Sequence, residues 1–397
     1  MIRIKCKGRR GWDLLNFILM LGVCVPPALL LSYSLQTCPD LVDATHPTNL
    51  NANPSSPVHL FGRWLYTITL RSDTLYHQSD LINRAACELF LWHPIVWVNV
   101  AYFVFVDIGF YIIYLLQGST WLIDPHWQLL PMCMSLFYYV HPNAIVIVGA
   151  DGGGGGGSGG GGAGAGAGAG SLGVGGGIVA ATAHHPRAVI TLILLWLWGF
   201  RLLNNYFRRE EWHVGEREDW RYADMRKQHG YFFLVTQFFA VSLAQHGMLV
   251  GLTLPLSAAM SSSGEMLNWL DGVALCLCLT GILVGFVADN QLYAYMTTKN
   301  KPVLLETGLW RYSRHPNHFG EQTWWVGLLL FGVASGAPLW PICFGVLFNH
   351  PLDTLVTLPM IEQRMLRRPE RVAAFKEYQQ CTSLIVPLPP SVKQKRS

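Results

Sequence analysis

Long apolar stretches recur along this chain of 397 residues, and they restrict it to folds that a lipid bilayer can accommodate. A transmembrane helix needs about 20 consecutive apolar residues, and its backbone must satisfy its own hydrogen bonds. Six stretches approach or exceed that length and are therefore predicted to be helices. They are Leu14–Leu35, Leu89–Leu116, Leu129–Gly149, Ala188–Leu203, Tyr231–Leu256 and Trp269–Ala288.

A seventh apolar region, Gln322–Leu358, is longer and is interrupted by Ser335-Gly336-Ala337-Pro338. Glycine and proline in such a cluster mark a turn, so we interpret the region as a C-terminal hairpin of two helices. The predicted fold class is an all-α, polytopic integral membrane protein with about eight transmembrane helices. The composition agrees, because 51% of the residues are hydrophobic and only 13% are charged. With a net charge of only +4 and mixed signs, no nucleic-acid partner is expected.

The segment 151–177 consists almost wholly of glycine with alanine and serine, and it divides the chain. Such a sequence buries too little apolar surface to offset its conformational entropy, so it is predicted to be a flexible linker. It separates an N-terminal membrane region, 1–150, with about three transmembrane helices, from a membrane domain, 178–390, and a basic tail, 391–397. Its G-x-G-x-x-G pattern lacks the strand and helix that a dinucleotide fingerprint requires. The nine scattered cysteines are interpreted as small hydrophobes rather than a disulfide framework.

The distribution of lysine and arginine predicts the orientation in the membrane. Five cations precede the first apolar stretch, which places the N-terminus in the cytoplasm and favours an uncleaved signal anchor. If the chain crosses the membrane with each successive helix, the segments 208–227 and 299–314 and the C-terminal tail lie on the same, cytoplasmic face. Lys393 and Lys395 resemble a dilysine retrieval signal, although a basic tail touching anionic headgroups would have the same composition. The expected location is the membrane of the endoplasmic reticulum, with the polar motifs facing the cytoplasm.

One segment, with the sequence GLWRYSRHPNHFGE, concentrates polar groups between two apolar stretches. Arg311, Arg314 and His315 can bind phosphate oxygens, and Asn317 can donate and accept hydrogen bonds at once. Glu321 follows Asn317 by one helical turn, on the same face. Anchoring at the membrane surface would require neither the amide nor the carboxylate. The cluster therefore predicts a site for an anionic, amide-bearing cofactor.

Further candidates lie outside that segment. Asp289 stands at the end of an apolar stretch, where an unpaired carboxylate costs free energy, and Tyr293 shares its helical face. Lys299 can reach a phosphate group. The block Glu218-Asp219-Trp220-Arg221-Tyr222 is either a solvated loop with local ion pairs or part of the mouth of the site.

Two other groups of polar residues have a structural explanation. Asp107 and His246 lie inside apolar runs and are interpreted as partners in helix–helix hydrogen bonds, with a lipid-lined cavity as the alternative. His315, His318 and Glu321 have a spacing that metal ligands can have. The other histidines form no clusters in the sequence, so no metal is expected.

Several of these residues carry a family resemblance. The residues Gly308, Trp310, Arg314-His315-Pro316-Asn317 and Phe319-Gly320-Glu321 resemble the signature of the steroid 5α-reductase-like membrane proteins, in a largely uncharacterised branch. Two further blocks agree: Glu218 to Tyr222 with Met225-Arg226, and a tail with Glu362, Arg364, Tyr378, Thr382 and Pro387. The resemblance covers roughly residues 192–390. At one position it fails, since the family usually has tyrosine where this chain has His318.

The resemblance implies an NADPH-dependent reductase that acts on a carbon–carbon double bond of a sterol or another lipid. In that family reading, Asn317 contacts the nicotinamide amide and the cations hold the phosphates. The implied site residues are, for catalysis, Glu321, His318 and Tyr293 and, for cofactor binding, Lys299, Trp310, Arg311, Arg314, His315, Asn317, Asp289, Trp220 and Arg221. Which of the three catalytic candidates donates the proton is left open.

Two alternatives remain open. Methyltransferases of the isoprenylcysteine carboxyl type share a related Arg-His-Pro segment, a hairpin and a Glu-bearing tail, but their cofactor, S-adenosylmethionine, has no phosphate. The cations Lys299, Arg311 and Arg314 favour NADPH. The second alternative is a catalytically silent lipid-binding or scaffold protein. The presence of His318 where the family usually has tyrosine leaves this alternative open.

Overall fold

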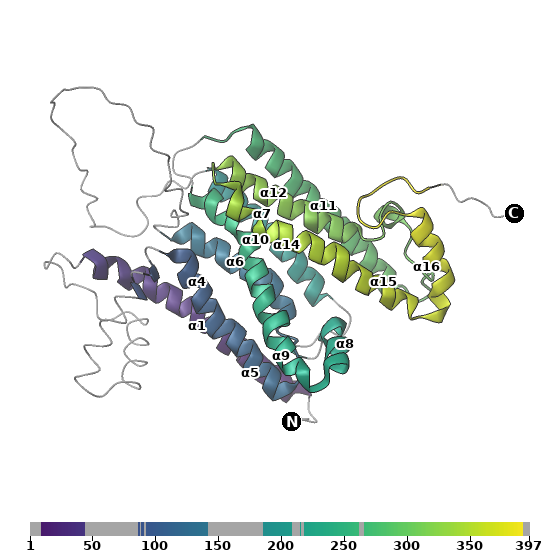
Figure 1. Cartoon of the computed structure of the whole chain (residues 1–397), viewed down its shortest axis with the longest axis horizontal. Coiled ribbons are helices and arrows are strands. Elements are labelled where there is room, and N and C mark those ends of the chain that lie inside the picture. The colour runs from purple at the N-terminus through teal and green to yellow at the C-terminus, as the bar shows by residue number, and fades with distance from the viewer. Residues whose placement is uncertain are drawn as a thin grey trace.

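The chain folds as a bundle of helices, seen in a computed structural model (Figure 1). The structure describes residues 9–43, 86–87, 89–90, 93–141, 186–208, 215, 218–261 and 266–391. The helical elements, in which η marks a 3-10 or π segment, are α1 (Arg9–Asp43), α4 (Pro94–Tyr102), η1 (Phe103–Asp107), α5 (Ile108–Gln117), α6 (Ile123–Val140), α7 (Pro186–Phe207), α8 (Trp220–His229), η2 (Gly230–Phe232), α9 (Phe233–Thr236), η3 (Gln237–Leu243), α10 (Ala244–Ser261), α11 (Trp269–Thr297), η4 (Gly308–Arg311), α12 (Pro316–Ala334), α13 (Leu339–Ile342), α14 (Phe344–Leu352), η5 (Asp353–Thr357), α15 (Leu358–Leu366) and α16 (Pro369–Cys381). These ranges contain no β-strand, which confirms the predicted all-α class.

Within the described ranges, five helical runs are long and apolar enough to cross a membrane. They are Leu14–Ser34, Pro94–Gln117, Pro186–Phe207, Trp220–Met260 and Trp269–Thr297. Each overlaps a predicted stretch, as expected of an integral membrane protein. The predicted total of about eight is not confirmed. α6 begins earlier than predicted and ends at Val140, while α12 and the run from α13 to α15 carry polar residues that reduce their apolarity.

The proposed divisions of the chain fall largely outside the described residues. The Gly-rich linker, 151–177, lies there, and so does the basic tail after Ser391. One prediction about the N-terminal region is wrong. Cys38, near the end of α1, forms a disulfide with Cys87, so these two cysteines are not simply small hydrophobes. They are 49 residues apart, and a separation of that length gives no local signal of pairing.

Glycines bring α11 and α12 into close contact. Gly281 and Gly285 form a small-xxx-small pattern on α11, and Gly320 lies against them from α12. A Cβ added at Gly281 would come within 2.6 Å of the Gly320 carbonyl oxygen. Such patterns let membrane helices approach closely enough for extensive van der Waals contact. The contact fixes the position of Glu321, the residue after Gly320.

The C-terminal hairpin forms as predicted. α12 ends at Ala334, and Gly336 in the turn has a φ of 79°, a conformation that favours glycine. The chain then returns through α13, α14, η5 and α15. This path brings Asp353, the first residue of η5, back to His318 in the first turn of α12.

Candidate functional site

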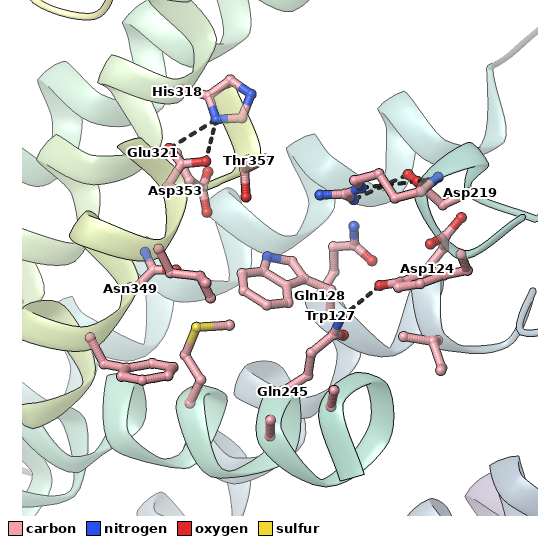
Figure 2. Close-up of a pocket in the computed structure, with 18 of the residues that line it drawn as sticks. Asp124, Trp127, Gln128, Asp219, Gln245, His318, Glu321, Asn349, Asp353 and Thr357 are labelled. Atoms are coloured by element: carbon pink, nitrogen blue, oxygen red, sulfur yellow. Dashed lines mark hydrogen bonds and ion pairs between the residues drawn. The ribbon is translucent and has the colours of Figure 1, made fainter. Parts of the chain in front are cut away.

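A cavity of about 420 Å³ lies between α6, α8, α10, α12 and the C-terminal hairpin (Figure 2). Its volume is in the range of small-molecule binding sites, and its lining combines apolar with polar side chains. Trp127, Met248 and Phe348 are among the apolar lining residues. More than half of the lining residues are polar or charged, so the cavity suits a ligand that has both apolar and polar parts.

His318, Glu321 and Asp353 lie together on one wall of the cavity (Figure 2). Nδ1 of His318 lies 3.0 Å from each carboxylate oxygen of Asp353, and Gln322 donates to the same carboxylate at 2.8 Å. With Nδ1 donating to Asp353, Nε2 is the ring nitrogen available to a ligand. A carboxylate in this position orients an imidazole and stabilises its protonated form, an arrangement suited to proton transfer.

Glu321 is held by two donors from α7. Nε1 of Trp198 lies 3.0 and 3.1 Å from its two oxygens, and Nη2 of Arg201 lies 2.7 Å from Oε2. Nη1 of Arg201 lies 3.8 Å from Asp289, which also accepts a hydrogen bond from Asn205. One buried guanidinium thus bridges two carboxylates, and this pairing offsets part of the cost of burying them.

Gly285 leaves the space that this guanidinium occupies, because a Cβ there would overlap Nη1 of Arg201. We expect Gly285→Ala to displace Arg201 from its carboxylates and to lower the free energy of unfolding by about 1–3 kcal/mol. Thermal unfolding of the detergent-purified protein measures this. Gly272→Ala is the matched control, since it lies in the same helix and its Cβ would meet nothing within 4 Å. Equal melting temperatures for the two variants would contradict the expected displacement.

The second sequence motif reaches the opposite wall of the cavity (Figure 2). Asp219 caps α8 by accepting from the backbone N–H of Arg221 at 2.8 Å, and it also binds Nε of that arginine at 2.9 Å. Arg221 and the buried Tyr222 line the cavity. Trp220 does not, because its ring lies 4.4 Å from the guanidinium carbon of Arg364.

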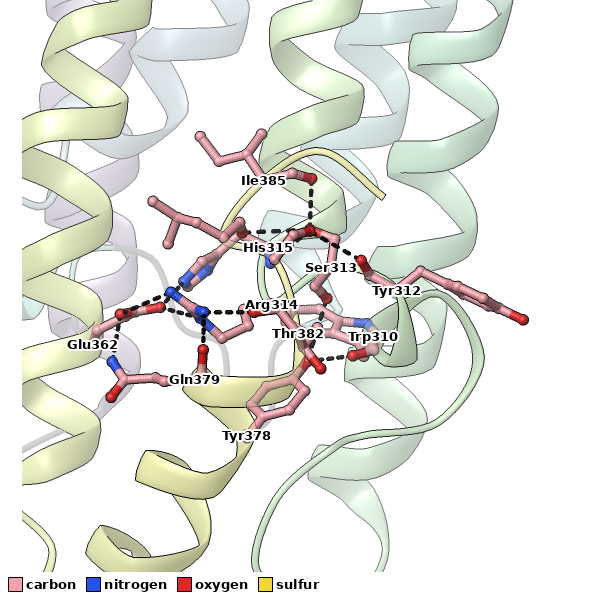
Figure 3. A network of polar contacts seen from close by, with 12 residues as sticks. Trp310, Tyr312, Ser313, Arg314, His315, Glu362, Tyr378, Gln379, Thr382 and Ile385 are labelled. Carbon is pink, nitrogen blue, oxygen red and sulfur yellow. Dashed lines mark hydrogen bonds and ion pairs between the residues drawn. The ribbon is translucent and has the colours of Figure 1, made fainter. Parts of the chain in front are cut away.

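Arg314 lies at the centre of a polar network that joins three segments (Figure 3). Its Nε donates to Glu362 at 2.7 Å, and Nη1 donates to the carbonyl oxygens of Gln379 at 3.0 Å and Thr382 at 2.6 Å. His315 lies 3.3 Å from the same oxygen of Glu362. Burial would raise the pKa of Glu362, but hydrogen bonds from His315 and Arg314 lower it to about 2. Burial also lowers the pKa of His315, more than its hydrogen bond to Glu362 raises it.

Trp310, Lys299, Arg311 and Tyr293 were also predicted to belong to the site. Trp310 is buried and donates to the carbonyl oxygen of Ala288 at 3.2 Å, which fastens η4 to α11. Lys299 and Arg311 are exposed. The guanidinium carbon of Arg208 lies 4.7 Å from the centroid of the Tyr293 ring. Tyr293 does not line the cavity.

Asn317 carries an unsatisfied polar atom. Its Oδ1 is buried and has no hydrogen-bond partner among the described residues. Buried polar atoms are nearly always paired, so this exception requires an explanation. Asn317 lies in the first turn of α12, next in sequence to His318 of the cavity wall, but it is not itself among the lining residues, so a ligand N–H would have to reach it beside the cavity. With exposed Lys299 and Arg311 nearby in sequence, the residues fit a cofactor that has a carboxamide and phosphates.

The structure brings three of the predicted site residues, Arg221, His318 and Glu321, to one cavity. The roles predicted for them, and for Arg314 as a phosphate ligand, stay predictions. Two participants were missed. Arg201 lies in an apolar helix, where ionisable residues are rarely without a function, and this was an available signal. Asp353 offered the same signal as a carboxylate within the apolar hairpin.

Comparisons with known proteins agree with the sequence motifs. A family model described as "Protein of unknown function (DUF1295)" matches residues 167–382, more than half of the chain. The "Uncharacterized protein C594.04c" of Schizosaccharomyces pombe is 30% identical over an alignment of 175 residues that covers 38% of this chain and 50% of that protein. The chain thus spans about half the length of this relative, and no solved structure matches. The chain belongs to the DUF1295 family, in the steroid 5α-reductase-like superfamily.

Proposed function

We propose that the protein is a membrane-embedded, NADPH-dependent reductase of a carbon–carbon double bond in a sterol or another lipid. The observation that carries this proposal is the cavity that His318, Glu321 and Asp353 line on one wall and Arg221 of the second motif lines on the opposite wall. Apolar lining residues such as Trp127 suit a lipid substrate. Membership of the family supports oxidoreductase chemistry in general terms.

The protein's task is to bind and orient the reactants. NADPH, when bound, supplies a hydride to one carbon of the double bond. Asn317 would accept a hydrogen bond from the carboxamide, because its Oδ1 otherwise has no partner. Lys299 and Arg311 would bind phosphate oxygens at the surface. Arg314 and His315 act indirectly in this proposal, since their bonds to the C-terminal segment keep the cofactor site in shape.

Of the three candidate proton donors, His318 has the strongest support. It lines the cavity, and Asp353 holds its ring with Nε2 available. Glu321 also lines the cavity, but both of its oxygens already accept hydrogen bonds from α7. Tyr293 is not among the lining residues. The second carbon of the double bond would therefore receive its proton from Nε2 of His318.

The proposed location is the endoplasmic reticulum, with the site facing the cytoplasm. Disulfides persist in oxidising compartments, which include the lumen of the endoplasmic reticulum. The Cys38–Cys87 disulfide lies at the end of α1 opposite to the basic N-terminus. It therefore supports an orientation in which the basic segments and the site lie in the cytoplasm.

One observation favours a second candidate, a methyltransferase that uses S-adenosylmethionine. Four carboxylates are among the described lining residues, Asp124, Asp219, Glu321 and Asp353, and they would stabilise a positive sulfonium. Two of these, Asp219 and Glu321, already pair with arginines. The negative charge available to a ligand is therefore smaller than four carboxylates would provide. We therefore prefer the reductase.

Cofactor binding separates the two candidates. We expect NADPH at about a hundredfold excess over its Kd to raise the Tm of the detergent-purified protein by several degrees, because that excess stabilises the folded state by about 2.7 kcal/mol. S-adenosylmethionine should leave Tm unchanged. The reverse pattern would establish the methyltransferase, and a Tm that neither cofactor moves would contradict both and favour a silent lipid-binding protein.

The variant Asn317→Leu makes this measurement specific to the site. The substitution removes an unsatisfied buried oxygen at similar volume, so the Tm without cofactor should not fall. The shift caused by NADPH should be lost. Asn204→Leu is the matched control, because Asn204 is exposed in α7 and should leave the shift intact.

A further inference from the structure

A second cluster of polar side chains lies outside the cavity lining. It consists of Asp107 at the end of η1, His126 in the first turn of α6 and His246 in the first turn of α10. Each offers one potential ligand atom, and the three atoms lie within 4.8 Å of one another. The side chains of Asp107 and His246 are only 1% and 7% exposed. The sequence suggested helix contacts for these two residues and gave no reason to place His126 beside them.

The atoms of the cluster lack hydrogen-bond partners. Oδ2 of Asp107, Nε2 of His126 and Nδ1 of His246 are all buried without one among the described residues. Oδ2 of Asp107 lies 2.9 Å from Nδ1 of His246. At this distance the Asp107 carboxylate is stabilised either by a proton on His246 or by a metal ion that both residues bind.

The hydrogen bonds of Asn99 assign the proton on His246. Nδ2 of Asn99 donates to the carbonyl oxygen of Ile95 at 2.6 Å, which fixes the amide with Oδ1 toward Nε2 of His246 at 3.1 Å. Because an amide oxygen only accepts, Nε2 carries a proton. Nδ1 then faces Asp107 as an N–H if the ring is protonated and as a lone pair if the ring is neutral. In the neutral ring, that lone pair is repelled by the carboxylate unless a cation binds both groups.

The surroundings resemble those of a metal ligand. A ligating histidine usually donates its other N–H to an oxygen, as His246 does to Asn99, and this bond fixes the ring orientation. Asp107 ends one π segment, and η3, a second π segment, directly precedes α10. Such segments occur frequently at functional sites. The ring of Phe110 packs edge-on against His126, with centroids 4.8 Å apart, and contributes an apolar shell.

We propose that Asp107, His126 and His246 bind a divalent transition-metal ion, Zn²⁺ in the first instance. Two imidazoles and one carboxylate, with a fourth position open, form a known zinc ligand set, whereas Ca²⁺ and Mg²⁺ prefer oxygen ligands alone. Ligand atoms in tetrahedral zinc sites are about 3.4 Å apart, given bonds of about 2.0–2.1 Å. The pair Asp107–His246 is closer than this, at 2.9 Å, and all three atoms lie within 4.8 Å of one another, so binding requires the side chains to adjust. The ion would join the N-terminal helices to α10 of the family domain.

Metal analysis of the full-length protein tests the proposal. The protein is purified in detergent without a histidine tag, incubated with Zn²⁺ and desalted. We expect about one zinc per chain, and a visible absorption band when Co²⁺ replaces Zn²⁺. Asp107→Asn and His126→Gln should each weaken Zn²⁺ binding by more than the 10–100-fold that loss of an outer hydrogen bond typically costs.

A control histidine makes the outcome specific. His229→Gln should retain one zinc per chain, because His229 is exposed and lies outside the cluster. The proposal is overturned if the wild type retains less than about one zinc in ten chains, or if the Asp107 and His126 variants bind Zn²⁺ like the wild type. One iron per chain in place of zinc would overturn the assignment of the metal. If a variant fails to fold, the wild-type protein alone is tested for a Co²⁺ absorption band that EDTA removes. The absence of that band would show that Asp107 and His246 form an ion pair and that the cluster binds no metal.

Discussion

Replacing Arg314 by alanine is expected to lower the free energy of unfolding by about 3–5 kcal/mol, even without any cofactor. The substitution leaves the ionised Glu362 with one charged partner fewer, and the carbonyl oxygens of Gln379 and Thr382 lose their donor. Thermal or denaturant unfolding of the detergent-purified protein measures the loss. A residue that serves only as a phosphate ligand would show no such loss, so the experiment separates the predicted role of Arg314 from the structural one.

Arg311→Ala is the matched control for this prediction. Arg311 lies three residues earlier and is exposed, so its removal should change the unliganded Tm by about a degree or less. Arg314→Lys should recover part of the loss, because an ammonium keeps the charge but lacks the planar fork of donors. A cofactor-free Arg314→Ala protein that unfolds like the wild type would show that the network does not stabilise the fold.

The pH dependence of that difference gives an independent measurement. The pKa of Glu362 is about 2 in the folded protein, below its ordinary value of 4.5. A folded-state pKa below the unfolded one means stabilisation that is present above about pH 4.5 and lost as the pH falls toward 2. The gap in stability between wild type and Arg314→Ala should therefore narrow over this range.

The sequence predicted the helices well because length and apolarity are local properties of a segment. α11 begins at the predicted residue, Trp269, since Asn268 caps it and forms a capping box with Asp271. The end of α11 was predicted too early. The helix continues to Thr297, and Asp289 therefore lies within it, where Arg201 of another helix compensates its charge.

The partners of the site residues could not be predicted, because they come from distant parts of the chain. Glu362 is 48 residues from Arg314, Asp353 is 35 from His318, and Arg201 is 120 from Glu321. Spacing along a sequence reveals pairs on one helix face, three or four residues apart. These three pairs depend instead on how α7, α12 and the hairpin pack. The sequence thus indicated candidate residues for the site and left their partners, orientation and charge balance undetermined.

Replacing His318 by alanine is expected to lower the rate of NADPH-dependent lipid reduction by about 10²–10⁴-fold, if His318 donates the proton. The stabilisation by NADPH should persist, since Asn317 and the surface cations are unchanged. Membranes that contain the protein are incubated with NADPH, and mass spectrometry follows the endogenous lipids that gain two hydrogens. An alanine variant that reduces these lipids at the wild-type rate would exclude His318 as the donor.

The variant His318→Tyr extends this prediction, because the family resemblance leads us to expect tyrosine at this position. A phenol can donate a proton, so His318→Tyr should recover much of the rate that His318→Ala loses. In water, a phenol keeps its proton to about 3.5 pH units higher than an imidazolium does. The fall in rate at high pH should therefore move upward in the tyrosine variant. In the wild type, Asp353→Asn should lower the rate of lipid reduction, because the Asp353 carboxylate stabilises the protonated ring of His318. In the His318→Tyr background, the same substitution should have little effect on the rate. An unchanged pH profile in His318→Tyr would mean that the proton comes from another group.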